Sequence, residues 1–403
     1  MAGYRDLLRT PGVGRMIAAQ LTARFPNGMA SLAILLHVEQ QTGSYGAAGL
    51  VLAATSVGQA VAGPVTSRWM GAWGMRRVLT LTTTVCVAAF LCVALLPLIL
   101  PGYMFFGLVA GLATPPIQSA VRTIYPKLVN SSQLTPLFSL DASLQEIIWI
   151  LAPVVITLVS TQIGTTEGLL LVAALLVVGC GWFILSPEVG RVRIPRSRRA
   201  FGRVVLKPPV LLATVIGFLL IGACSAVEVG VVATFEHGSI EAGVVLAVFA
   251  VGSLAGGLSM GHIPIGPWAM ARRLVIVTIG LALTMVSLNV FWLGGTLLIA
   301  GIGIAPALAV LFAITTASVK FSETAEAFGW AGTGQLIGAA AGSAIAGFLV
   351  DSTGGARGAY LAAVLFAIVG VVVAVVFVRA FPDLRHRDPS PFPDTEPVAV
   401  TPS

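Results

Sequence analysis

Three ionisable residues fall inside long apolar runs of the sequence, where a charged side chain is costly. Arg24 and Glu146 lie near the middle of such runs, and Glu228 lies late in another. A charge at the centre of a bilayer costs about 2.5 to 3.5 kcal/mol on insertion scales, so each side chain must face a cavity or a partner. An isolated buried carboxyl tends to hold a proton, whereas a paired one stays ionised. The chemistry that these residues suggest is therefore ion pairing and proton exchange.

Arg24 and Glu146 are expected to pair, because they are the two charges nearest the membrane midplane in the N-terminal half. Arg24 precedes Pro26 and Asn27. A proline inside a helix frees a backbone carbonyl and can kink the helix, and a charge beside a kink is typical of a binding site. A purely structural ion pair is the alternative.

Glu228 stands between apolar neighbours, with no cation at the same depth in its own half. Such a carboxylate suits proton coupling, and the alternative is that it lines the outer vestibule. The expected substrate-binding or proton-coupling set is completed by Asn27, Gln118, Gln145, Trp330 and Gln335.

Asp141 is expected to act in a gate rather than at the transport site. It precedes Glu146 by five residues and therefore lies closer to the inner end of the same helix, where Arg122 or Arg76 could meet it. The expected gate or latch residues are Arg76, Arg77, Arg122, Asp141 and Glu326.

The elements that position these residues are membrane-spanning helices. Hydrophobic residues make up 57% of the 403 residues and charged residues only 10%, far from the roughly 25% charged content of soluble domains. A bilayer core of about 30 Å requires about 20 apolar residues per helix. Twelve such runs are expected, approximately at 13–37, 47–70, 77–97, 101–125, 137–161, 166–185, 209–234, 240–262, 272–292, 294–318, 325–350 and 357–379.

Prolines mark bending points in two of these helices. Pro115 and Pro116 fall in the fourth run and Pro306 in the tenth, which are equivalent helices if the chain consists of two halves. The four cysteines lie in apolar runs without metal-ligand spacing, so neither a metal site nor a disulfide framework is expected. No nucleotide-binding loop or nucleophile triad appears, so we expect a protein that is not an enzyme and needs no cofactor.

A strongly basic stretch divides the chain. Residues 187–208 carry seven cations and are expected to link a six-helix half at 1–186 to another at 209–380. The last segment, 381–403, is polar and has six prolines from residue 382 onward, so it is expected to be a disordered cytoplasmic tail.

The distribution of Lys and Arg predicts orientation. On an alternating path, 21 of the 23 fall on the side of the two termini, Arg24 lies in the membrane and only Arg357 lies opposite. Cytoplasmic loops carry such an excess, so both termini are expected in the cytoplasm of a multi-pass protein of the cell membrane. Orientation in the bilayer also explains the net charge of +7, and nucleic-acid binding is not expected.

An internal repeat supports the two halves. The segment AGLVLAATSVGQAVAG at 48–63 aligns without gaps with AGVVLAVFAVGSLAGG at 242–257, and 8 of 16 positions are identical. The pair Arg76-Arg77 recurs after it as Arg272-Arg273. Parallel six-helix repeats are typical of one class of transporter, in which substrate binds near the midplane between the halves.

The sequence resembles the major facilitator superfamily over its whole length except the tail, and looks most like its small bacterial exporters. Residues 63–79, GPVTSRWMGAWGMRRVL, are similar to the family's loop signature, with Gly74 and the arginine pair in register. Gly71 and Ala72 replace the usual Asp-Arg pair, so the family's inner latch would be incomplete. Ala152-Pro153 stands where the family's antiporters have Gly-Pro.

This resemblance implies a fold and a function. The expected fold is an all-α polytopic membrane protein with twelve transmembrane helices in two pseudo-symmetric six-helix bundles. The expected activity is proton-coupled export of small organic molecules by alternating access, by a protein that acts as a monomer in the lipid bilayer. Uptake or facilitated transport of a sugar or other metabolite, and a non-transporting membrane sensor, are the alternatives.

Overall fold

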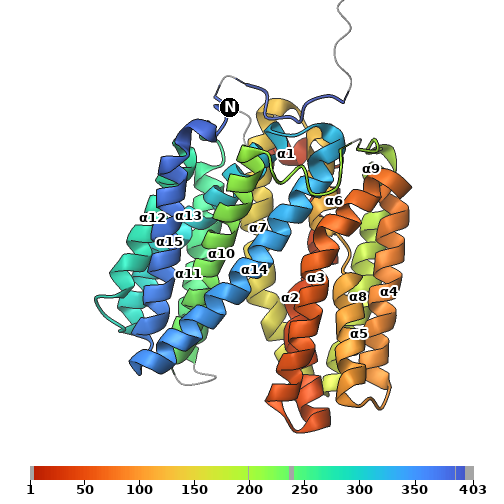
Figure 1. Ribbon diagram of the computed structural model, residues 1–403, viewed down its shortest axis with the longest axis vertical. Helices are drawn as coiled ribbons and strands as arrows, with labels where there is room; N and C mark the ends of the chain where they lie inside the picture. The colour runs from red at the N-terminus through yellow and green to blue at the C-terminus, as the bar shows by residue number, and fades with distance from the viewer. Residues whose placement is uncertain (1–3, 198, 236–239, 386, 395–403) are drawn as a thin grey trace, which may run out of the picture.

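The computed structural model describes residues 4–197, 199–235, 240–385 and 387–394, which are almost entirely helical (Figure 1). The helices are α1 (Tyr4–Arg9), α2 (Val13–Thr42), α3 (Tyr45–Trp73), α4 (Met75–Leu95), α5 (Leu100–Leu112), α6 (Ile117–Leu128), α7 (Ser131–Gln162), α8 (Thr165–Leu185), α9 (Pro187–Arg191), α10 (Pro208–Thr234), α11 (Ile240–Met260), α12 (Ala269–Thr284), α13 (Val290–Ala317), α14 (Phe321–Thr353) and α15 (Arg357–Val376), with a short 3-10 helix at Val378–Ala380.

These helices form two bundles of six membrane-crossing segments, as the sequence predicts. The first bundle contains α2, α3, α4, α5 with α6, α7 and α8, and the second contains α10 to α15. Within the described residues, ten segments are long and apolar enough to span a membrane by length and composition. The two other segments are α2, which carries Arg24 and Asn27 in its interior, and α12, which has only 16 residues.

The fourth crossing segment is broken at its proline pair. α5 ends at Leu112 and α6 begins at Ile117, with Pro115 and Pro116 between them. Proline lacks an amide donor and forces the preceding residue out of the helical region, so two in succession interrupt the helix. Pro306 lies inside α13, which remains one continuous helix. The bending point expected at Pro115 and Pro116 is therefore confirmed, as a break between α5 and α6. At Pro306 the helix is not interrupted.

The internal repeat is visible in helix packing. A side chain at Gly58 of α3 would clash with the backbone of α5 at Leu108, and a side chain at Gly252 of α11 would clash with that of α13 at Leu298. Gly58 and Gly252 are equivalent positions in the sequence repeat. Small residues let membrane helices approach closely, and each half uses the same crossing.

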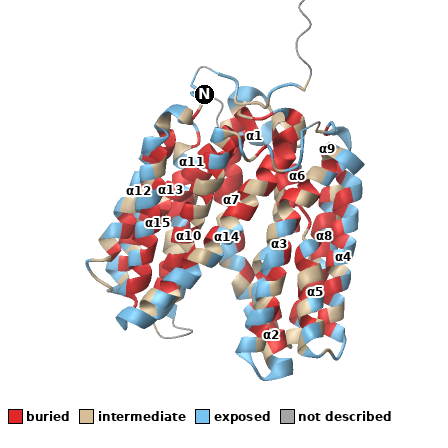
Figure 2. Ribbon diagram, viewed as in Figure 1, coloured by how far each residue is buried: buried red, intermediate tan, exposed pale blue. Residues whose placement is uncertain are grey.

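The two halves meet at one end of the molecule and diverge toward the other (Figure 1). We call the first end the basic end, because α1, the linker between α9 and α10, and the segment after α15 all lie there. Thr333 on α14 donates to the Ala60 carbonyl on α3 at 2.7 Å, and Ser139 on α7 donates to the Gly257 carbonyl on α11 at 2.6 Å. The inner faces of both halves are buried, and most outward faces are exposed (Figure 2).

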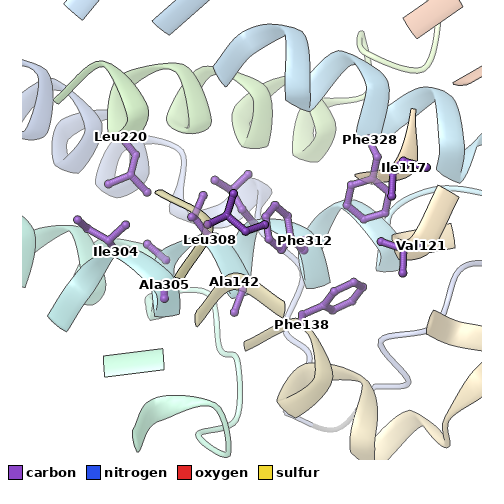
Figure 3. Packing of buried hydrophobic residues seen from close by; sticks show 14 of the residues in the cluster. Ile117, Val121, Phe138, Ala142, Leu220, Ile304, Ala305, Leu308, Phe312 and Phe328 are labelled. Atoms are coloured by element: carbon purple, nitrogen blue, oxygen red, sulfur yellow. The ribbon is translucent and has the colours of Figure 1, made fainter. Parts of the chain in front are cut away.

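Apolar side chains from both halves close the basic end (Figure 3). Phe138 on α7 lies 6.1 Å from the Phe312 ring on α13 and 6.3 Å from the Phe328 ring on α14, measured between centroids. Phe312 and Phe328 are themselves 6.1 Å apart. Aromatic rings at these separations attract one another, and this attraction adds to the stabilisation that comes from burying their apolar surface. This group, which we call the aromatic plug, packs the two halves against each other.

The chain after α15 differs from the disordered tail that its composition predicts. The Leu384 amide donates to the Ile265 carbonyl, and Phe392 pairs with the α13–α14 connection through Val319 and Phe321, each bond 2.9 Å long. Loop backbone groups at the ends of helices lack intrahelical partners, so a polar segment can dock on them without burying much apolar surface. Residues 395–403, the remainder of the predicted tail, lie outside the described residues.

Candidate functional site

A buried polar cluster in the N-terminal half is centred on Asp141 of α7, whose side chain is fully buried. One carboxylate oxygen accepts hydrogen bonds from Gln20 at 3.1 Å and Arg24 at 3.0 Å on α2, and from the Tyr125 hydroxyl on α6 at 3.2 Å. The other accepts from Arg122 on α6 at 3.2 Å. Four donors from two helices thus converge on one carboxylate.

The cluster carries more positive than negative charge. Arg24 and Arg122 are both buried, and Asp141 is the one carboxylate that contacts them in the described structure. Arg24 also donates to Gln20 and Gln145, and the Gln118 amide lies 3.1 Å from that of Gln145. With its amide oxygen turned toward the arginines, Gln118 accepts from both. The amide oxygens therefore stabilise the positive charge that Asp141 does not balance.

Arg122 also interacts with the opposite half. Its guanidinium carbon lies 3.5 Å from the centroid of the Phe312 ring and 5.8 Å from that of Phe328. An arginine over an aromatic face is attracted by the ring quadrupole. The charged cluster and the aromatic plug are therefore in contact, and movement of one half relative to the other would change the surroundings of Arg122.

The pairing expected for Arg24 is wrong, because its partner is Asp141 rather than Glu146. The two acidic residues are five positions apart, which rotates them by about 140° around the helix and separates them by about 7.5 Å along it. Asp141 faces α2 and α6, whereas Glu146 faces the other half. The expected contact between Asp141 and Arg122 is present, whereas Arg76 instead donates to the backbone carbonyls of Ile184, in the last turn of α8, and Ser186, directly after it.

Glu146 belongs to a second acidic group that spans the two halves. Its carboxylate accepts from Ser253 on α11 at 2.8 Å and lies within electrostatic range of Glu228 on α10. Glu228 is exposed. It was expected to lack a charged neighbour in its own half, and its charged neighbour, Glu146, belongs to the opposite half. The thiol of Cys224, one turn before Glu228, is near both. No ion pair involves either carboxylate among the described residues.

The other predicted binding residues lie in different surroundings. Asn27 is exposed on α2. Trp330 packs against Phe201 of the linker, with ring centroids 5.8 Å apart, and so lies at the basic end rather than beside the carboxylates. Gln335 lies against α10 at Gly217, and its side-chain amide nitrogen is buried without a hydrogen-bond partner in the described structure.

Glu326 forms a contact between the halves that involves an arginine outside the predicted set. Arg68 at the end of α3 donates to Glu326 on α14 at 2.5 Å, and the linker amide of Gly202 donates to the same carboxylate at 2.8 Å. Arg77 is exposed. Arg68 and Glu326 thus connect the halves beside Gly71 and Ala72, where the sequence lacks the Asp-Arg pair.

Two further residues were missed by sequence reasoning. Gln20 and Tyr125 both donate to Asp141. For Gln20 a signal was present, because residues four apart share one face of a helix, whereas Tyr125 has no polar residue at that spacing. The polar pairs with this spacing are Gln20 with Arg24, Gln118 with Arg122, and Asp141 with Gln145.

Charge reversal tests the Arg68–Glu326 contact. Arg68→Glu would set two carboxylates against each other at the basic end, and loss of a partly exposed ion pair of about 1 kcal/mol changes an equilibrium about fivefold. We expect maleimide to label a cysteine at Ser139, introduced into a cysteine-free chain, about fivefold faster. The double variant Arg68→Glu with Glu326→Arg should restore slow labelling. Equal labelling of all three proteins would show that this contact does not hold the halves together.

No cluster of three or more His, Cys, Asp or Glu side chains suited to a metal ion occurs within the described ranges. The charged groups of the site are therefore the Asp141 cluster and the pair formed by Glu146 and Glu228. The first lies within the N-terminal half, and the second connects the two halves through the Glu146–Ser253 hydrogen bond. Such an arrangement can bind and release protons or a charged solute.

The family model described as Major Facilitator Superfamily matches residues 16–300. A search of curated protein sequences finds no match.

Similar solved structures cover nearly the whole chain. A bacterial homologue of the iron transporter ferroportin, in an outward-facing state, has a TM-score of 0.72 and 13% identity over 91% of this chain and 99% of that one. The human organic anion transporter MFSD10 (TETRAN) has a TM-score of 0.68 and 14% identity over 90% and 100%. The proton:xylose symporter XylE bound to 6-bromo-6-deoxy-D-glucose has a TM-score of 0.67 and 12% identity over 92% and 96%. At these identities the shared property is the fold.

Proposed function

Because the chain belongs to the major facilitator superfamily, a family of transporters, we propose that it is a proton-coupled secondary transporter that exports small organic molecules by alternating access. It would act as a monomer in the cell membrane, with the two halves rocking about a midplane cavity. The observation that carries the proposal is the contact of Glu146 with Ser253, which brings this carboxylate to the opposite half, where it senses the charge of Glu228.

Two carboxylates that sense each other's charge suit proton coupling. Ionising both at once sets like charges against each other, so one bound proton relieves the repulsion. Because one carboxylate belongs to each half, relative motion of the halves changes their separation. Proton binding and conformational change are therefore linked. Binding of a proton favours the conformation in which the two carboxylates are near each other, and that conformation in turn favours proton binding.

The basic end would face the cytoplasm. Exposed cations concentrate on the loops and linker of this end, and cytoplasmic loops are enriched in Lys and Arg. Among the described residues, no hydrogen bond joins the two halves on the far side of the Glu146–Ser253 contact. The structure would then be an outward-facing state, in which the carboxylate pair exchanges protons with the exterior. A reporter active only in the cytoplasm should give signal when fused at the C-terminus, and signal only outside would reverse the orientation.

The Asp141 cluster would form the floor of the cavity. Gln118 and Gln145 extend from it toward the level of Glu146 and offer amide groups to a solute. Arg24 and Arg122 favour bound groups that carry negative or partial negative charge. The carboxylate pair beyond them would bind either a proton or a basic group of the solute.

A growth screen tests the direction of transport and the chemical class of the solute. The gene would be expressed in a host that lacks its own efflux pumps and challenged with a panel of toxic organic compounds. Export predicts raised tolerance to a subset of the panel, and the Glu228→Gln protein at equal expression should give none. Raised sensitivity of the host would instead indicate uptake.

A further inference from the structure

A cavity of about 440 Å³ lies at the basic end, apart from the site between the halves. It is enclosed by the last turns of α3 on one side and by the linker on the other. The residues that matter for its chemistry are Val65, Arg68, Trp69 and Trp73 on α3, and Arg196 and Phe201 on the linker.

The aromatic wall of this cavity consists of two stacked tryptophans. Trp69 and Trp73 are one helical turn apart, with ring centroids at 4.9 Å and an angle of 24° between the ring planes. Both are exposed, at 38% and 52%. Tryptophan is enriched where a membrane meets water, because its ring is apolar and its N–H group is polar. This wall is therefore suited to the boundary between lipid headgroups and acyl chains.

The two cations of the cavity differ in their partners. Arg68 is already bound by Glu326 and by the Arg199 carbonyl, and it lies 5.9 Å from the Phe201 ring centroid. Arg196 is exposed, and no hydrogen bond or ion pair involves it in the part of the chain that the structure describes. Its charge is therefore available to an anion that enters the cavity.

An apolar stripe leads from the cavity along α3 toward the membrane interior. Val57 and Val61 are exposed, at 60% and 51%, and Val65 continues the spacing of four residues to the tryptophans. Residues four apart lie on one face of a helix, so the stripe is continuous. It provides a surface for an acyl chain whose headgroup lies beside Arg196.

We propose that this cavity binds an anionic phospholipid, with its phosphate beside Arg196, its glycerol region on the two tryptophans and an acyl chain along the stripe. Basic pockets beside membrane helices at the cytoplasmic surface recognise anionic headgroups by this combination of charge and apolar contact. A zwitterionic lipid would bring an ammonium group close to the arginine and is therefore disfavoured. Since the cavity joins α3 to the linker, a bound lipid would also contact the element that connects the halves.

Quenching of tryptophan fluorescence by brominated lipid tests this assignment on the full chain. The protein would be reconstituted into phosphatidylcholine vesicles in which a rising mole fraction is brominated phosphatidylglycerol or brominated phosphatidylcholine. The signal of the two tryptophans is the difference between the wild type and a variant with Trp69→Phe and Trp73→Phe. We expect this signal to be quenched at lower mole fractions of the brominated phosphatidylglycerol.

Two linker variants separate the site from general attraction to charge. Arg196→Gln should lower the preference for phosphatidylglycerol about fivefold, because it removes the cation that lies beside the bound phosphate. Arg193→Gln removes an exposed cation of the same linker that does not line the cavity, and it should leave the preference unchanged. Equal quenching by both lipids in the wild type, or equal loss in both variants, would overturn the proposal. Displacement of the brominated lipid by inorganic phosphate alone would also overturn it, by assigning the site to a free anion.

Discussion

The Glu228→Gln protein is expected to lose all transport driven by a pH gradient while it retains exchange of substrate for substrate. Glutamine matches the shape and hydrogen bonding of a protonated glutamate but cannot release a proton. Exchange requires no net movement of protons, so it should continue when net transport has fallen to the level measured without a gradient. The measurement is the accumulation and counterflow of a substrate identified by the growth screen, in vesicles of known internal pH.

Matched variants locate the proton more closely. Ser253→Ala removes the hydroxyl that donates to Glu146 but leaves both carboxylates, so it should weaken coupling without abolishing it. Glu241→Gln changes an exposed carboxylate at the start of α11 and should have no effect. Retained gradient-driven transport in Glu228→Gln would assign the proton to Glu146 alone, and loss of exchange as well would make Glu228 a substrate ligand.

Asp141→Asn is expected to be the most destabilising change of charge in the N-terminal half. It would leave two buried arginines without a carboxylate, and removal of one partner of a buried pair costs about 3 to 5 kcal/mol. Arg24→Gln should cost less, because Arg122 and Asp141 would remain as a neutral pair. The measurement is the midpoint of thermal unfolding of each purified protein in the same detergent.

The double variant supplies the control for this charge count. Adding Arg24→Gln to Asp141→Asn removes one of the two uncompensated cations and should recover part of the lost stability. Arg122 would still lie over the Phe312 ring, where its charge is partly stabilised. An Asp141→Asn protein as stable as the wild type would show that the cluster is not held together by charge.

The helices, the two halves and the basic linker could be predicted from sequence because each depends on local composition. Apolar runs of spanning length fix the helices, and the repeat between 48–63 and 242–257 fixes the equivalence of α3 and α11. The break at Pro115 and Pro116 follows from proline chemistry. These features require no knowledge of which helix lies beside which.

Pairing between helices could not be predicted in the same way. Depth in the membrane suggested Glu146 as the partner of Arg24, but rotation around α7 decides the contact, and it presents Asp141 instead. The spacing of four residues that relates Asp141 to Gln145 indicates a shared face, and both side chains accept from Arg24. Glu228 becomes one of a pair only because α7 packs against the half that carries it, with Glu146 bonded to Ser253 on α11, which no local pattern records.

The segment after α15 shows a different limit. Its composition predicts disorder because it has little apolar surface to bury, yet its backbone bonds to Ile265, Val319 and Phe321. Composition reports side-chain burial and does not record the backbone groups that loops leave unpaired. Trp330 shows a related limit. Its residue type suggested a substrate contact, but a residue type does not record which neighbour the side chain meets, and Trp330 packs on Phe201 of the linker.

The central claim is that protonation of the Glu146–Glu228 pair is linked to the positions of the two halves. The distance between spin labels at Gln41 and Ser352 tests it most directly, because these exposed residues end α2 and α14 where the halves diverge. Both would be changed to cysteine, and spin-labelled, in a chain whose four native cysteines are replaced. The distance between the labels would be measured by pulsed electron paramagnetic resonance between pH 5 and 8.

Because Glu146 contacts the opposite half in the present state and experiences the charge of Glu228 there, ionising both carboxylates would destabilise that state by repulsion. Lowering the pH should therefore increase the population with the long distance, and Glu228→Gln should remove this dependence. A distance distribution that does not change with pH, or one that changes equally in the Glu228→Gln protein, would contradict the account.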